Sequence, residues 1–103
     1  MVNIIIYLEQ SNEAQEIVHE LLEAKLIANA SIDIENESYS LENETIVKRI
    51  NSVITAQTKS MLFSTIEKLI HEKHGSEVPI FSVPITQANE KFDFIIRNST
   101  IKS

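Results

Sequence analysis

The chain has 103 residues, enough for a single domain over residues 1–103 and too few for two. Nine lysine and arginine residues against fifteen aspartate and glutamate residues give a formal charge of −6, so the phosphates of a nucleic acid would repel the protein. Its single glycine, Gly75, excludes the glycine-rich loops that hold phosphate groups, and the absence of cysteine excludes disulfides and thiolate metal sites.

The start of the chain lacks the basic region of a signal peptide. The longest apolar run is far shorter than the roughly 20 residues that a membrane helix needs. We therefore expect a cytoplasmic protein that has neither a membrane nor a nucleic acid as its partner.

The first two predicted elements are a strand and a helix. Residues 2–8 form a β-branched run that is too short for a helix, which predicts a buried strand. Over residues 12–25 apolar side chains recur at helical spacing with glutamates between them. This pattern predicts an amphipathic helix, with an N-cap offered by residues 11–13.

Residues 29–58 predict a long antiparallel hairpin. Apolar and polar side chains alternate over residues 29–40, as in a half-buried strand. A polar, turn-like segment at 41–45 leads to a second extended stretch at 46–58. The alternation of that stretch slips near residues 52–54, where we expect a β-bulge or a local twist.

A second helix is predicted from Ser60, a possible cap, to about Lys73, with Gly75 as its terminator. Its apolar face carries Leu62, Ile66, Leu69 and Ile70. This helix resembles the first in being apolar on one side only, so both are expected to cover the same core.

The remainder of the chain predicts a strand, a helix and a tail. The strand covers residues 80–85, and its Pro84 suits a sheet edge or a strand end because proline lacks a backbone N–H. A short helix over residues 88–97 closes the fold. The polar tail after Asn98 is expected to be frayed.

The order of elements predicts an α+β fold of the ferredoxin-like βαββαβ type, with an antiparallel sheet, two helices on one face and a short C-terminal helix. The first strand is apolar on both sides at residues 4–6, and the last strand places Phe81 and Val83 together on one side. Two helices can cover only one face of the sheet. Because large exposed apolar patches usually mark interfaces, the pattern predicts an oligomer.

Four segments carry further information through their order and spacing. They are EAKLIANA at residues 23–30, ESYSLEN at 37–43, HGSEVP at 74–79 and VPITQAN at 83–89. Together they resemble the CutA (divalent-cation tolerance) family, and the resemblance spans nearly the whole chain.

The resemblance implies a non-enzymatic homotrimer whose long hairpins pair between subunits and which is linked to tolerance of copper and other divalent cations. On the hairpin, the expected interface residues are Tyr39, Leu41 and Ile46. The chain also departs from the family, because the cysteine after the first helix is replaced, with Asn29 and Ala30 in that region. Any metal role of that cysteine is not transferred to this protein.

The resemblance also places His74 at the family's histidine position, close to Glu77. Imidazole suits copper and zinc, and His71 is close enough along the same helix to share a face with His74. The predicted metal ligands are therefore His74, Glu77 and His71, for copper or another divalent cation. The alternative is that His74 only ends a helix, where its positive charge meets the helix dipole and Glu77 satisfies it.

Three functions stay open at this point. The first is a CutA-like trimer in metal tolerance, the second is a trimeric small-molecule sensor similar to the PII signalling proteins, and the third is a scaffold of the same fold that no longer binds metal. We expect no enzymatic activity, because the chain lacks cysteine and its serines have no activating sequence context.

Overall fold

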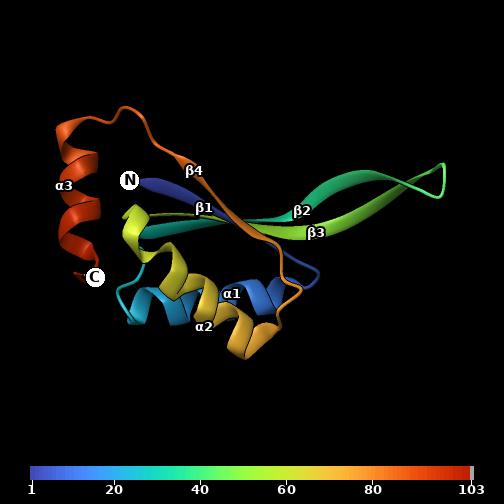
Figure 1. The fold of residues 1–103 in the computed structure, drawn as a ribbon, viewed down its shortest axis with the longest axis horizontal. Coiled ribbons are helices and arrows are strands. Elements are labelled where there is room, and N and C mark those ends of the chain that lie inside the picture. The colour runs from blue at the N-terminus through green and yellow to red at the C-terminus, as the bar shows by residue number, and fades with distance from the viewer. Residues whose placement is uncertain (103) are drawn as a thin grey trace.

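Residues 1–102 are described by a computed structural model, in which they form a four-stranded antiparallel sheet and three α-helices (Figure 1). The strands lie in the order β2-β3-β1-β4. The elements are β1 (Val2–Leu8), α1 (Ser11–Glu23), β2 (Asn29–Glu42), β3 (Thr45–Thr58), the 3₁₀ helix η1 (Ser60–Leu62), α2 (Phe63–His74), β4 (Ile80–Pro84) and α3 (Glu90–Ser99). The predicted α+β fold of ferredoxin-like type is confirmed.

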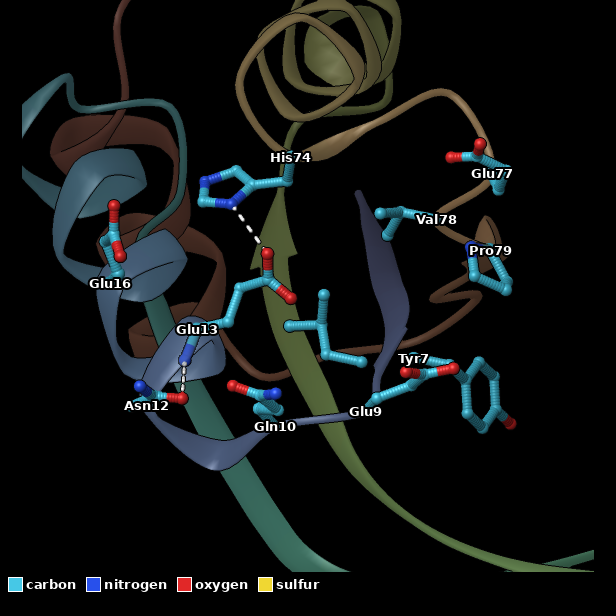
Figure 2. Close-up of a pocket in the computed structure, with 11 residues that line it drawn as sticks. Tyr7, Glu9, Gln10, Asn12, Glu13, Glu16, His74, Glu77, Val78 and Pro79 are labelled. Carbon is cyan, nitrogen blue, oxygen red and sulfur yellow. Dashed lines mark hydrogen bonds and ion pairs between the residues drawn. The ribbon is translucent and has the colours of Figure 1, made fainter.

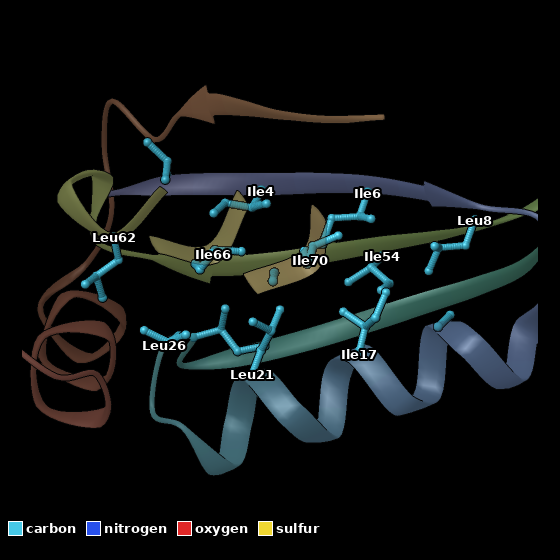
Figure 3. Packing of buried hydrophobic residues seen from close by; sticks show 14 residues of the cluster. Ile4, Ile6, Leu8, Ile17, Leu21, Leu26, Ile54, Leu62, Ile66 and Ile70 are labelled. Carbon is cyan, nitrogen blue, oxygen red and sulfur yellow. The ribbon is translucent and has the colours of Figure 1, made fainter. Parts of the chain in front are cut away.

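Both α1 and α2 pack on the same face of the sheet and enclose the hydrophobic core (Figures 1 and 3). Every second side chain from Val2 to Leu8 is buried in this core, because alternate residues of a strand point to the same face. The helices contribute Ala14, Ile17 and Leu21 from α1 and Ile66 and Ile70 from α2. Each such isoleucine or leucine contributes roughly 1.5–3 kcal/mol relative to an exposed one.

The helix starts differ from the predicted caps. Ser11 and Ser60 are the first residues of α1 and η1 rather than caps, and no side chain caps either start. The end of α1 is built from backbone bonds instead. The amide of Leu26 donates to the carbonyl of Leu21 at 2.9 Å, while Lys25 has a left-handed φ of 57°. This is a Schellman motif, and it ends the helix two residues before the predicted boundary.

The hairpin of β2 and β3 extends well beyond the rest of the sheet (Figure 1). Each of these strands has 14 residues, whereas β1 has 7, and pairing with β1 ends where Leu8 lies opposite Ser52. Beyond that point β2 and β3 pair only with each other. We call this part, residues 36–51, the arm.

The predicted β-bulge lies on the other strand of the hairpin. The register shift is in β2, between Asp33 and Asn36, which lie opposite Val53 and Asn51 of β3. The slip in the sequence of β3 comes instead from Ser52, a polar residue at a buried position between Ile50 and Ile54 on the same face of the strand. The predicted position along the hairpin was right, because the bulge lies opposite residues 51–53, but the predicted strand was wrong.

The remaining predicted elements agree with the structure at small shifts of boundary. Gly75 follows α2 directly with a φ of 112°, a region that favours glycine. Pro84 ends the edge strand β4. Helix α3 stands at the end of the sheet where β1 begins (Figure 1), and Asn89 caps it by accepting a hydrogen bond from the amide of Phe92 at 2.9 Å.

The prediction of a frayed tail is wrong through residue 101. The hydroxyl of Thr100, a buried residue, donates to the carbonyl of Ile96 at 2.8 Å, and the amide of Ile101 donates to the carbonyl of Lys25 at 2.9 Å. The ammonium of Lys59 donates to the carbonyls of Thr100 and Ile101 at 3.3 and 3.1 Å. The acceptors of these bonds are backbone carbonyls, so the polarity of the side chains does not reveal them.

Candidate functional site

The sheet face opposite α1 and α2 carries an apolar patch. The register places Ile5 beside Phe81 and Asn3 beside Val83, and the ring of Tyr7 stacks on Phe81 with centroids 6.2 Å apart. Phe81 and Val83 are 44% and 43% exposed. The predicted two-sided apolar pattern of the sheet is therefore present, and we call this surface the open face.

A second apolar surface runs along one side of the arm. Even-numbered residues of β3 point to the helix side of the sheet, and the register sets Leu41 opposite Ile46 and Tyr39 opposite Lys48. Four exposed side chains therefore share that side, namely Tyr39, Leu41, Ile46 and Ile50, with exposed fractions of 52–73%. We call them the arm stripe. The structure brings together the three predicted interface residues on it.

The other side of the arm is polar. The amides of Asn36 and Asn51 hydrogen-bond to each other at 2.9 Å, and each also donates to the hydroxyl of Ser38. Nearby, the guanidinium of Arg49 forms a two-pronged ion pair with Glu42. The hydrogen bond from Arg49 lowers the pKa of the Glu42 carboxyl to about 2. The arm is thus an amphipathic ribbon.

His74 ends α2, and its imidazole faces α1 (Figure 2). The side chain is only 6% exposed. Its Nδ1 lies 3.2 Å from Oε2 of Glu13, and its Nε2 lies 3.6 Å from Oε2 of Glu20. Both ring nitrogens therefore meet carboxylates of α1, which differs from the alternative in which Glu77 satisfies this histidine.

His71 and Glu77 lie elsewhere. The Nε2 of His71 is 3.2 Å from the carbonyl oxygen of Val78, so that ring is engaged by the backbone after α2. Glu77 lies on the far side of the pocket from the imidazole of His74 (Figure 2). The imidazole of His74 therefore faces α1 and not Glu77 (Figure 2), while His74, Glu77 and His71 as a joint ligand set remain a prediction.

A different group of metal-ligating side chains lies together in residues 1–102. One ligand atom from each of Glu16, Glu20 and His74 lies within 4.8 Å of the other two. The Oε2 of Glu20 and the Nε2 of His74 are buried, and neither has a hydrogen-bond partner in the described structure. The ammonium of Lys73 also lies 3.8 Å from that Glu20 oxygen.

The surface beside His74 is hollowed and acidic. The hollow measures about 650 Å³ and is lined by Tyr7, Leu8, Glu9, Gln10, Asn12, Glu13, Glu16, His74, Glu77, Val78 and Pro79 (Figure 2). Four of these residues are glutamates, so the hollow favours a cation over an anion.

Sequence reasoning missed the glutamates of α1 because they are 54 or more residues away from His74 in the chain. Their signal was the four-residue spacing of Glu16 and Glu20, which places both on one helix face. The ferredoxin-like fold lays the two helices side by side on the sheet. Combining that fold with this spacing would have brought His74 to the same face.

The family described as CutA1 divalent ion tolerance protein matches residues 2–99. A search of curated proteins found no match. Within residues 1–102, no helix is both long enough and apolar enough to cross a membrane.

Solved structures of CutA proteins share the fold over almost the full chain. CutA1 from Pyrococcus horikoshii is 19% identical with a TM-score of 0.87, covering 99% of this chain and 100% of that one. CutA1 from Oryza sativa is 16% identical with a TM-score of 0.89, covering 99% and 94%. The periplasmic divalent cation tolerance protein CutA from Archaeoglobus fulgidus is 25% identical with a TM-score of 0.84, covering 96% and 98%. The chain therefore belongs to the CutA1 divalent ion tolerance protein family.

Proposed function

We propose that the protein is a non-catalytic homotrimer that acts in divalent cation tolerance, with copper among the cations to which it responds. Family membership supports the cation role, and the observation that carries the assembly is the pair of unpartnered apolar surfaces. The open face and the arm stripe lie on opposite sides of one sheet, and α1 and α2 cover neither. Neighbouring copies would bury both.

The assembly also agrees with the size of the domain. A chain of about 100 residues buries a modest fraction of its surface on folding and gains from a partner. Four large side chains more than half exposed along one ribbon are costly in water, and their burial in a trimer would stabilise it.

Light scattering tests the assembly. The full chain at micromolar concentration should have the mass of a trimer. A Leu41→Asp variant should dissociate, because it places a charge in the buried stripe, whereas Leu22→Asp, the same change on the exposed surface of α1, should remain trimeric. A monomeric wild type would refute the assembly, and a trimeric Leu41→Asp variant would refute the burial of the arm stripe within it.

Copper binding centres on His74 in this proposal, with Glu77 and His71 as the partners that the sequence suggested. Calorimetric titration of Cu²⁺ into the wild type and into His74→Ala tests it. Strong binding by the wild type and weak binding by the variant are expected. Equal and weak binding by both would show that this protein is a scaffold without a metal site.

We place the protein in the cytoplasm, in part because a chain without cysteine suits a reducing compartment. The relative from Archaeoglobus fulgidus is described as periplasmic, so compartment is not uniform among these proteins. Cell fractionation followed by immunodetection decides between the two compartments.

A small-molecule sensor similar to PII proteins is the second function, and one observation favours it. A hollow of about 530 Å³ lies between the base of the arm and the end of β1, lined by Tyr7, Leu8, Glu9, Arg49, Ile50, Asn51, Glu77 and Pro79. It combines an apolar wall with one arginine. Thermal-shift screening of nucleotides and metabolites tests it, because a ligand that binds only the folded state raises the melting temperature.

A further inference from the structure

The geometry points to a specific cation site in which Glu16 and Glu20 of α1 and His74 of α2 together bind Zn²⁺ or Cu²⁺ and link the two helices. The inference rests on the proposed function, since it names where the cation is held. It replaces Glu77 and His71 as ligands and leaves the assembly untouched.

The hydrogen bond to Glu13 fixes which nitrogen of the His74 ring carries the proton. Its Nδ1 lies 3.2 Å from the Glu13 carboxylate and donates its proton to it. A ligating histidine commonly has such a carboxylate on its second nitrogen, which fixes the tautomer and raises ligand basicity. In a neutral ring with that tautomer the lone pair is on Nε2, which is buried and has no hydrogen-bond partner within the described residues. A buried polar atom without a hydrogen-bond partner is able to take a ligand such as a water or an ion.

Two carboxylates of α1, those of Glu20 and Glu16, lie near the imidazole of His74. The Oε2 of Glu20 is 3.6 Å from Nε2 and is likewise buried without a hydrogen bond in the described structure. Ligands about 2.0–2.1 Å from a tetrahedral ion are about 3.4 Å apart, so these two atoms already have nearly the right separation. Glu16, one turn earlier on α1 and exposed, completes the group within 4.8 Å.

The donor set selects the metal. One imidazole and two carboxylates suit Zn²⁺ and Cu²⁺, whereas Mg²⁺ and Ca²⁺ favour oxygen ligands alone. Three protein ligands leave a fourth position for water, and the exposed Glu16 opens that position to solvent. Such a site can exchange its ion with the surroundings, which a tolerance protein requires.

The charge balance also favours a cation. Glu13, Glu16 and Glu20 bring three carboxylates to the site, against one ammonium, that of Lys73, at 3.8 Å from Glu20. The side chain of Lys73 is 58% exposed and can move into solvent when an ion enters. The competing arrangement is a protonated His74 that pairs with Glu13 and Glu20, without any metal.

Calorimetric titration of the full chain with Zn²⁺ and with Cu²⁺ separates these arrangements. Glu16→Gln and Glu20→Gln should each weaken binding at least tenfold, and the double variant should bind neither ion measurably. Glu13→Gln, which touches no metal, should weaken binding about 10- to 100-fold. Glu72→Gln, an exposed change of the same charge on α2, is the matched control and should bind like the wild type.

Thermal unfolding gives a second readout on the same proteins. A saturating ion should raise the melting temperature of the wild type and of Glu72→Gln, and it should leave the double variant unchanged. Because Glu16 is exposed, Glu16→Gln folds normally and keeps the test valid even where Glu20→Gln alters stability.

The outcomes separate the two proposals. If the wild type binds metal and the double variant binds equally well, the site is overturned while the proposed function stands. Loss of binding in Glu77→Gln and His71→Asn, with full binding by the double variant, would assign the site to the ligands that the sequence predicted. A trimeric wild type that binds neither ion would overturn both the site and the cation role.

Discussion

At the residue scale, the chain holds left-handed backbone with side chains that do not favour it. Lys25, Asn43 and Glu44 have φ values of 57°, 51° and 65°. Asparagine tolerates this region, but lysine and glutamate carry a steric cost there. With one glycine in the chain, these turns are made without the residue that suits them best.

Replacing Lys25 with glycine should therefore stabilise the protein by about 0.5–1 kcal/mol, because glycine accepts the left-handed position that closes the Schellman motif. Chemical unfolding of wild type and variant measures the difference. Ala24→Gly is the matched control. Ala24 has right-handed φ and ψ of −79° and −3°, so glycine brings no gain there and this variant should be less stable than the wild type. A destabilised Lys25→Gly protein would show that its side chain, and not its backbone, matters there.

The stability that the ion pair of Glu42 and Arg49 contributes should depend on pH. The hydrogen bond from Arg49 lowers its pKa from 4.5 to about 2, so the ion pair stabilises the folded state above pH 4.5 and is lost as the pH falls towards 2. In Arg49→Gln the pKa of the Glu42 carboxyl should rise towards 4.5, while the hydrogen bond from Ser40 continues to lower it. NMR titration of Glu42 measures both values, and an unchanged low pKa in the variant would assign the shift to another neighbour.

At the element scale, prediction from sequence succeeded where a periodic pattern decided the structure. The apolar alternation of β1 and the helical spacing of α1 and α2 identified the buried face of each element, and these faces meet in the core. It failed where side-chain polarity misled. Buried Ser52 looked like a break in β3, and the polar tail looked free although its backbone is anchored.

The surroundings of His74 show a different limit. His74 was singled out from the sequence, yet the carboxylates beside its ring come from another helix and depend on how α1 and α2 pack. Spacing along one helix can group His71 with His74, but it cannot show that the Nε2 of His71 faces the carbonyl of Val78. Contacts between elements are the part of a site that one sequence determines least directly.

The tail gives the prediction that belongs to this scale. Lys59→Met removes the ammonium that binds the carbonyls of Thr100 and Ile101, so the segment after α3 should open more often. The amide of Ile101, which donates to Lys25, should then exchange its hydrogen several-fold faster. Lys68→Met on α2 is the control. Equal exchange in all three proteins would mean that the hydrogen bonds of Lys59 do not hold the tail.

At the scale of the whole molecule, the apolar side chains are distributed between one enclosed core and two open surfaces. The core lies between the sheet and its two helices, while the open face and the arm stripe lie outside it. The elongated shape, 46 × 29 × 20 Å, follows from the arm. In the proposed assembly, a ribbon that extends this far with an apolar side would be stabilised by a second chain.

This arrangement predicts that stability depends on protein concentration. If folding and assembly are coupled, the melting temperature should rise with concentration, because association draws the equilibrium towards the assembled form. In a variant that carries Leu41→Ser and Ile46→Ser, the melting temperature should be lower and independent of concentration. Calorimetry over a hundredfold range measures both. Since both residues are about 70% exposed in the single subunit, their loss should hardly affect an isolated chain, so an unchanged concentration dependence would place the contact elsewhere.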